Sequence, residues 1–289
     1  MFFNSYNKPG KGVNKRDPNQ PRITTFFEIL PRKIWPLCKA NMLHLLTAIP
    51  FFVITMVVMG IISSKVINLF SAILGEEEFG STLLILDVIL RWFLAILFTV
   101  FFGQGPVTAG TTYIIRNYAR EEHCWPVSDF FEKTKENFKQ SIGIWIIDLG
   151  FFYVVTIAFV FYWTSANYIL AFLLIWIAII YIVMHIYIYQ LIITFDLPLR
   201  HNLRNAFIFT FANAPKNLLL LLIVVAVHMV LPYVALLYYS NKSIIVLLVW
   251  ALLELILLPA LTSFMTNFFI YPSIEKYINL ANENKNLTD

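Results

Sequence analysis

The chain has 289 residues, of which 59% are hydrophobic and only 13% are charged, and its formal net charge is +4. Soluble domains carry about 25% charged residues, so this composition excludes an ordinary soluble protein and indicates one that lies in a lipid bilayer. The small positive charge does not indicate a nucleic-acid partner, because the polar stretches contain no RNA- or DNA-binding motif.

The amino-terminal segment, residues 1–40, is basic and precedes the first apolar run, which begins near residue 41. No small-residue cleavage site follows that run, so we do not expect a removable signal peptide. A helix that crosses a bilayer needs about 20 mostly apolar residues, and six stretches meet this requirement. The six predicted spans are residues 41–62, 83–105, 141–162, 168–195, 216–239 and 243–270.

These spans predict an all-α polytopic membrane bundle over residues 41–270, with loops at about 106–140 and 196–215 and a tail at 271–289. Lys and Arg in short loops stay on the cytoplasmic side of a membrane. Of the 21 basic residues, eighteen fall in the amino-terminal segment, these two loops and the tail, whereas Lys65 and Lys242 fall on the other side. We therefore expect a multi-pass protein of the cell membrane with both termini in the cytoplasm.

Three ionisable residues within the predicted spans form a candidate polar cluster: Asp87, Arg91 and Glu254. Asp87 and Arg91 are four residues apart and share one helical face, so they can pair directly. Counting along the helices places Glu254 at a similar depth, so Arg91 could also be shared with Glu254. Ionisable groups within a membrane are costly, and the cluster either pins the helix packing or lines a path for a polar substrate or proton.

The inner end of the second predicted span has an unusual local sequence, GQGPVTAG, over residues 103–110. Its notable members are Gly103, Gly105, Pro106 and Gly110. Glycines and a proline permit a sharp helix break and a close backbone approach. A phosphate cradle is the other interpretation, but the lysine and the spacing of a nucleotide-binding loop are missing. We therefore predict a packed helix break.

The loops suggest a unit of an interfacial helix followed by a helical hairpin, used three times. Phe130, Phe131 and Phe138 recur at helical spacing opposite charged residues, which is typical of an amphipathic helix at a membrane surface. A proline follows near the end of each hairpin, at Pro106, Pro198 and Pro272, where it is expected to break the helix.

The long cytoplasmic loop is also a candidate surface for docking a partner protein. Its candidate residues are Arg116, Arg120, Glu121, Glu122, Phe130, Phe131 and Phe138. Arginine and aromatic side chains commonly anchor interfaces. The alternative is that these aromatic rings rest on lipid headgroups while the charges face water.

The sequence carries no pattern that indicates an enzyme. Its five histidines lie on different segments, and none is paired at the spacing that puts two metal ligands on one helical face. The nucleophile elbow, the Walker loop and the dinucleotide fingerprint are missing as well. We therefore predict no catalytic residues, no bound metal and no cofactor.

Residues 103–122, 128–131 and 138–140, together with the opening residues 8–13, resemble the YesL-like family of bacterial integral membrane proteins. The resemblance runs over nearly the whole chain. It carries no established activity and no catalytic residues. Members of that family are typically encoded beside sugar-uptake genes, so the resemblance implies a role near a carbohydrate ABC transporter.

Two function classes follow. The first is a non-enzymatic accessory or scaffold component of a carbohydrate ABC uptake system, whose partners are the lipid bilayer and the transporter subunits. The second is a permease-type transport subunit with a polar path through its bundle. A polar cavity within the bundle would favour the second class, and a tightly packed bundle the first.

Overall fold

The computed structural model describes residues 20–74, 80–239 and 243–286, and within these residues the chain forms only helices and their connections. In chain order the elements are α1 (Arg22–Leu74), α2 (Gly80–Phe102), α3 (Pro106–Arg120), α4 (Pro126–Glu136), α5 (Phe138–Thr164), α6 (Tyr168–Thr194), α7 (Leu199–Ala212), α8 (Ala214–Val225), the π-helical turn η2 (Ala226–Val230), α9 (Leu231–Tyr238), α10 (Ser243–Ile256) and α11 (Leu258–Asn286).

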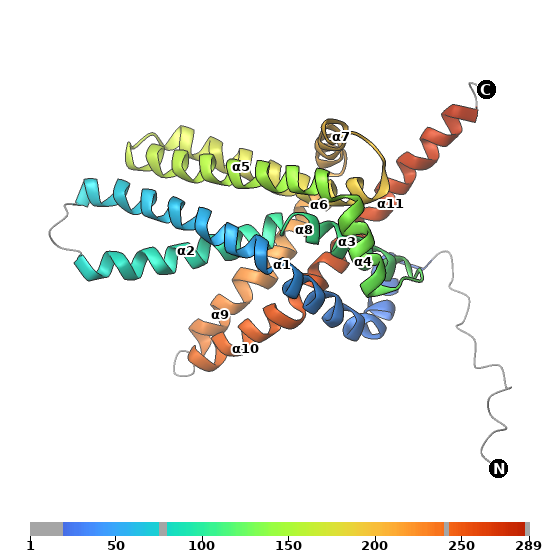
Figure 1. The fold of residues 1–289 in the computed structure, drawn as a ribbon, viewed down its shortest axis with the longest axis horizontal. Coiled ribbons are helices and arrows are strands. Elements are labelled where there is room, and N and C mark those ends of the chain that lie inside the picture. Colours follow the sequence, from blue (N-terminus) through green and yellow to red (C-terminus); the bar gives the residue numbers. More distant parts are fainter. Residues whose placement is uncertain (1–19, 75–79, 240–242, 287–289) are drawn as a thin grey trace, which may run out of the picture.

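Five stretches of the described helices are long and apolar enough to cross a bilayer: one each in α1, α2, α5 and α6, and the run from α8 through α9. The pair α10 and α11 makes a sixth when it is counted as one bent span. The predicted all-α polytopic bundle is therefore confirmed. Figure 1 shows the helical hairpins extending to one side, with α3, α4 and α7 gathered at the other end.

The sixth predicted span is not a single straight helix, because α10 and α11 meet at an angle of 52°. Proline has no backbone N–H, so Pro259 cannot donate to the carbonyl of Leu255 four residues earlier. The side chain of Asn41 on α1 donates to that carbonyl instead, at 2.7 Å. A carbonyl that loses its helical partner inside a membrane bundle requires another donor. Helix α1 therefore provides the hydrogen bond that is missing at the break between α10 and α11. These two helices form the second arm of the third hairpin, and α8, η2 and α9 form its first arm.

The amino-terminal segment and the first span were expected as separate elements, but one helix, α1, runs through both from Arg22 to Leu74. Its early turns bury Phe26, Ile29 and Leu37 against α3 and α11. The apolar face of the early turns therefore continues into the span without an intervening loop. Pro272 was likewise expected to end a helix, and it lies inside α11 instead.

Helix α3 is the packing centre of the end that carries the loops, because it contacts α1, α4, α5, α6 and α11. Ile114 and Ile115 of α3 are fully buried in one apolar cluster with residues of α1, α4 and α11. Figure 1 shows α4 and α7 turned away from the direction of the hairpins. Short helices in this arrangement link one hairpin to the next.

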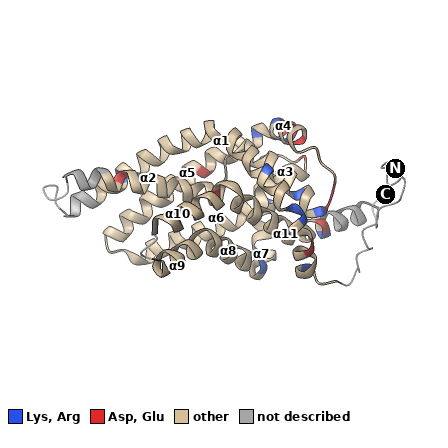
Figure 2. Cartoon of the chain, turned by 90° about the horizontal axis from the view of Figure 1, so that it is seen from below, with Lys and Arg blue, Asp and Glu red and all other residues tan. Residues whose placement is uncertain are grey.

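Charge is distributed unevenly along the molecule. Figure 2 shows most described Lys and Arg residues at the end formed by α3, α4, α7 and α11, and few charged residues along the hairpins. The middle of the molecule presents apolar helix surfaces, with exposed Leu, Ile, Val and Phe side chains. Apolar side chains exposed in this way are suited to lipid contact.

Candidate functional site

A cavity of about 580 Å³ lies between the helices of the bundle, and we call it the chamber. It is partly open, because Trp92, Ile96 and Leu255 in its lining are exposed. Its lining residues come from α1, α2, α3, α6, α8, η2, α10 and α11. All three hairpins therefore contribute to its walls. Glu254 is the sole Asp or Glu among its described lining residues, and no Lys or Arg is found among them. The remaining polar lining consists mainly of imidazole, hydroxyl and carboxamide groups.

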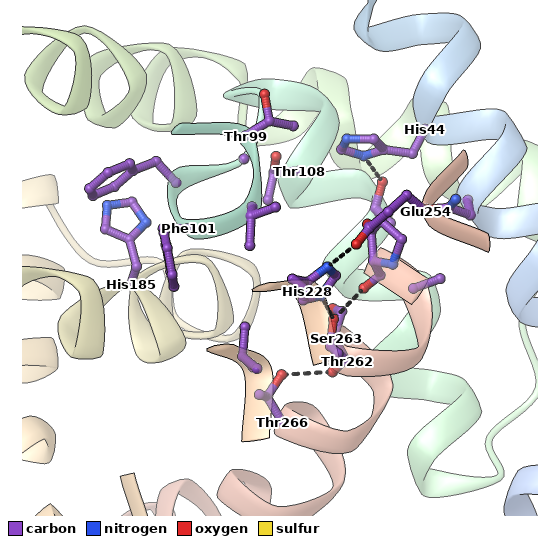
Figure 3. A pocket seen from close by; sticks show the side chains of 18 of the residues that line it. His44, Thr99, Phe101, Thr108, His185, His228, Glu254, Thr262, Ser263 and Thr266 are labelled. Atoms are coloured by element: carbon purple, nitrogen blue, oxygen red, sulfur yellow. Dashed lines mark hydrogen bonds and ion pairs between the residues drawn. The ribbon is translucent and has the colours of Figure 1, made fainter. Parts of the chain in front are cut away.

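Three histidines reach the chamber, each from a different hairpin: His44 from α1, His185 from α6 and His228 from η2. Figure 3 shows them around one space, with Thr99 and Thr108 between them. Each histidine has a hydrogen-bond partner within the protein. The His44 ring, for example, is bonded through Nδ1 to the hydroxyl of Thr111 at 2.8 Å.

The break between α2 and α3 forms one wall of the chamber. Gly103 and Gly105 have φ angles of 74° and 57°, in the left-handed region that favours glycine. A Cβ atom at Gly103 would lie 2.4 Å from the hydroxyl oxygen of Thr108. Pro106 then begins α3, as the fixed φ of proline favours at a first helical position. The backbone thus turns sharply where the sequence predicted a break.

The side chain of Gln104 closes this turn. Its amide nitrogen donates to Thr99 Oγ1 at 2.8 Å, and its backbone N–H donates to Thr108 Oγ1 at 2.6 Å. Because Gln104 is buried, these bonds compensate for the loss of water. The turn therefore presents a hydrogen-bonded, ordered edge to the chamber.

Glu254 and His228 meet in the chamber wall formed by the third hairpin. His228 Nδ1 lies 2.7 Å from Glu254 Oε1, and His228 Nε2 lies 3.0 Å from Thr262 Oγ1. Figure 3 shows both contacts. His228 sits in the π-helical turn η2, and such turns are frequent at functional sites. The His228 imidazole thus connects η2 with α10 and α11 through hydrogen bonds.

The sequence-predicted cluster of Asp87, Arg91 and Glu254 is therefore divided. Arg91 pairs with Asp87 at 2.6 Å, and Ser63 also donates to Asp87 at 2.6 Å. Gly60 leaves room for this pair, since a Cβ atom there would lie 3.0 Å from the Arg91 guanidinium carbon. Of the two partners considered for Arg91, the structure places Asp87 beside it and directs Glu254 to His228.

A second imidazole–carboxylate contact lies between α5 and α6. Asp148 is fully buried, and its Oδ1 atom accepts a hydrogen bond from Tyr181 at 2.8 Å and is 2.7 Å from His185 Nε2. Sequence reasoning did not connect Asp148 with His185, and it missed Tyr181. The available signal was the four-residue spacing of Tyr181 and His185, which places both on one face of α6.

Two of the seven predicted docking residues, Arg116 and Phe130, are buried, and three more pair with charged residues of the chain. Arg116 is only 8% exposed, its guanidinium donates to Thr194 at 2.8 Å, and burial lowers its pKa. Arg120 pairs with Glu122 at 2.6 Å and lies over the ring of Tyr271. Glu121 pairs with Arg32 at 2.9 Å, and Phe130 is 1% exposed. Five members of the set are exposed: Arg120, Glu121, Glu122, Phe131 and Phe138.

Catalysis and metal binding require reactive or clustered side chains. Burial raises the pKa of the Cys124 thiol, which makes it a poor nucleophile at neutral pH. Within the part of the chain that the structure describes, no group of three or more His, Cys, Asp and Glu side chains could hold a metal ion. The polar side chains in the chamber lining can form hydrogen bonds, and Glu254 is the one carboxyl group among the described lining residues.

The fold and the chamber define a polytopic α-helical membrane protein whose bundle contains a cavity with a mostly apolar lining and a few polar side chains. Residues 84–159 match the model of DUF624, a family described as proteins of unknown function. The matched region includes the break between α2 and α3, all of α4 and most of α5. No curated protein and no solved structure matches the chain.

Proposed function

We propose that the chain is a permease-type transport subunit that binds a small polar solute in the chamber. The chamber is the observation that carries this proposal, because a scaffold has no need of a cavity that is walled by all three hairpins and holds three histidines and Glu254. Its volume of about 580 Å³ is within the range of about 300 to 1,000 Å³ found for small-molecule sites. Because all three hairpins contribute to the walls, a bound solute would contact each hairpin and could change their relative positions.

The lining is mostly apolar with a few hydrogen-bonding side chains, so it favours a neutral solute over an ion. A phosphate or carboxylate would meet the Glu254 side chain without a described Lys or Arg in the lining to compensate it. Hydroxyl and amide side chains can bond to a polyol, and Trp92 and Trp250 add aromatic surface. The indole N–H of Trp250 is buried without a partner. A carbohydrate fits these properties.

The YesL-like resemblance implies a role near a carbohydrate ABC transporter and so supports the same substrate class. The DUF624 match agrees with that resemblance, because YesL-like proteins carry the DUF624 region. The orientation proposed for the chain places the loop-bearing end of the bundle, with α3, α4 and α7, in the cytoplasm. Its support is the gathering of Lys and Arg at that end, together with the retention of basic loops on the cytoplasmic side. Both termini are then cytoplasmic, and the membrane is the cell membrane.

A chamber-filling variant tests the solute site. Ala251 lines the chamber on α10, so Ala251→Phe is expected to weaken the binding of a neutral sugar at least about tenfold, a change of ~1.4 kcal/mol. The next residue, Leu252, is exposed and does not line the chamber, so Leu252→Phe is the matched control. Binding of neutral mono- and oligosaccharides would be measured by calorimetry on the purified chain in lipid nanodiscs.

Two outcomes would contradict the proposal. One is that no neutral sugar binds the parent protein. The other is that Ala251→Phe and Leu252→Phe bind a sugar equally well, because binding would then lie outside the chamber.

A second candidate function is supported by a separate observation on the proposed cytoplasmic end. Trp125 and Phe131, at the start and middle of α4, are 68% and 52% exposed. Exposed aromatic side chains of this kind can anchor a partner. We propose on this basis that α4 docks subunits of a carbohydrate ABC uptake system, for which the chain would be an accessory component.

Replacing both aromatic side chains, as Trp125→Ser with Phe131→Ser, is expected to abolish co-purification of such subunits while the chain still folds and inserts. The control is Trp163→Ser, an exposed aromatic at the opposite end of the α5 and α6 hairpin. Reversing the charge of Arg116 would be a poor test, because that side chain is buried and bonded to Thr194. Retention of the subunits by the double variant would show that α4 only contacts lipid headgroups.

A further inference from the structure

The exposed part of the chamber lining is confined to neighbouring segments of two spans. Among the described lining residues, those that are exposed are Trp92 and Ile96 on α2, Ala251 and Leu255 on α10, and Pro259 in the first turn of α11. Helix α2 packs mainly against α1, α5 and α6, whereas α10 packs mainly against α1, α9 and α11. Figure 1 shows α10 diverging from α2. The chamber therefore opens between α2 and α10, and we call these five residues the mouth.

The mouth lies at the depth of the membrane interior. At about 1.5 Å per residue, Trp92 and Ile96 lie about 10 and about 17 Å along the apolar stretch of α2 that begins at Ile85. Ala251 and Leu255 lie at the same two distances along the apolar stretch of α10, which begins one residue after the start of that helix. The hydrocarbon core of a bilayer is about 30 Å thick. The mouth is therefore placed to face lipid chains and not water.

The opposite end of the chamber, toward the loop-bearing helices, is closed by hydrogen-bonded side chains. Gln190 on α6 donates to the side chain of Asn267 on α11, and each of these residues is 3% exposed. Thr112 on α3 is 6% exposed, and its hydroxyl donates to the carbonyl of Thr108 at 2.7 Å. The described lining at this end thus offers no exposed residue comparable with the mouth. An occupant reaches the chamber most directly from the bilayer.

Polarity changes between the mouth and the interior of the chamber. The mouth residues are apolar or aromatic, whereas Figure 3 shows Thr99, Thr108, His228 and Glu254 around the interior. A free sugar that crosses an apolar mouth gives up water without gaining hydrogen-bond partners, which is costly. A polar head group on a hydrocarbon chain avoids much of this cost, because the chain stays in apolar surroundings while the head group reaches the interior.

We propose that the chamber takes its solute from the bilayer through the mouth, and that this solute is a neutral amphiphile. Its hydrocarbon chain lies between α2 and α10, and its head group forms hydrogen bonds with the polar side chains of the chamber. The sideways entry stands on the exposure and the depth of the mouth. The identification of the head group as a sugar rests on the proposed function, so the substrate class becomes a sugar linked to a hydrocarbon chain.

Photochemical labelling tests the sideways entry. The probe is a neutral alkyl glucoside with a diazirine on its chain close to the glucose, added to the purified full chain in lipid nanodiscs. Light converts the diazirine to a carbene that inserts into neighbouring bonds, so labelling requires no reactive side chain. Mass spectrometry then identifies the labelled residues. We expect label on interior lining residues that are half-buried, such as Thr99 and Phe101, as well as on the mouth.

A variant that narrows the mouth gives the decisive comparison. Ile96→Trp is expected to lower the labelling of the interior several-fold. Ile89→Trp is the matched control, because Ile89 is exposed on the same helix and does not line the chamber. If Ile96→Trp does not fold, Leu255→Trp replaces it, with Leu252→Trp as the control on α10. Equal interior labelling in a mouth variant and its control, or label found only outside the chamber, would overturn the proposal.

A second probe separates this inference from the proposed function. It is a long-chain alcohol with the diazirine at the same position and no sugar. Stronger interior labelling by the glucoside than by the alcohol would support both the sideways entry and the sugar head group. Equal labelling by the two probes, lowered for each by Ile96→Trp, would support the entry and refute the sugar. Interior labelling by neither probe would overturn the entry, while calorimetry with free sugars still tests the solute site by itself.

Discussion

Gly110→Ala is expected to destabilise the protein, whereas Gly150→Ala is expected to be neutral or stabilising. A Cβ atom at Gly110 would lie 2.2 Å from Thr134 Oγ1 and 2.7 Å from the backbone carbonyl oxygen of Phe130. The two helices α3 and α4 would have to separate, and overpacking of this kind costs about 1 to 3 kcal/mol. Because the contact includes backbone, side-chain rotation alone cannot relieve it.

The control at Gly150 isolates this effect from helix propensity. A Cβ atom there meets nothing within 4 Å, and alanine favours a helix over glycine by up to about 1 kcal/mol. The same gain acts at Gly110 and only partly offsets the clash. Melting of both variants in one detergent would be compared with the parent protein. Equal melting temperatures for the two variants would show that α3 and α4 do not approach each other this closely.

Arg91→Met and Asp87→Asn are each expected to destabilise the protein, and the double variant is expected to lose less stability than the sum of the two losses. Each single change leaves one charge within the membrane without its partner, and an ionised side chain there costs at least ~2.5 kcal/mol. The double change removes both charges and leaves none without a partner. Thermal melting of the parent, the two single variants and the double variant gives the coupling directly.

The matched control combines Arg91→Met with Glu254→Gln. Because Glu254 contacts His228 and Arg91 contacts Asp87, these two changes should be additive. Strong coupling between Arg91 and Glu254, with additivity between Arg91 and Asp87, would contradict the pairing in the structure.

The membrane class and most of the spans could be predicted from local sequence because they depend on the length of apolar runs. The break after Phe102 was also predictable, since glycines at positive φ and a following proline act within a few residues. The bend between α10 and α11 was missed although Pro259 signals it. A proline alone does not tell whether a membrane helix is interrupted or only kinked, because the outcome depends on a partner such as Asn41.

The charged partners were harder to predict. Depth along a helix suggested that Arg91 and Glu254 could meet, but depth gives no information on which helices are neighbours. In the structure Glu254 on α10 faces His228 at the π-helical turn of the same hairpin. The burial of Arg116 was missed for a related reason. Charged residues such as Arg116 indicate an exposed surface by composition, yet α3 is surrounded by α1, α4, α6 and α11, which buries that side chain.

By itself, the sequence determined that this chain is a helical membrane protein, where its apolar helices lie and where the second helix ends, because these properties arise from neighbouring residues. Only the tertiary structure decided that histidines from three hairpins reach one chamber, and that Glu254 contacts His228. Such contacts depend on how distant helices cross and which faces they turn to one another. That information comes from the packing of the whole bundle and not from any one segment.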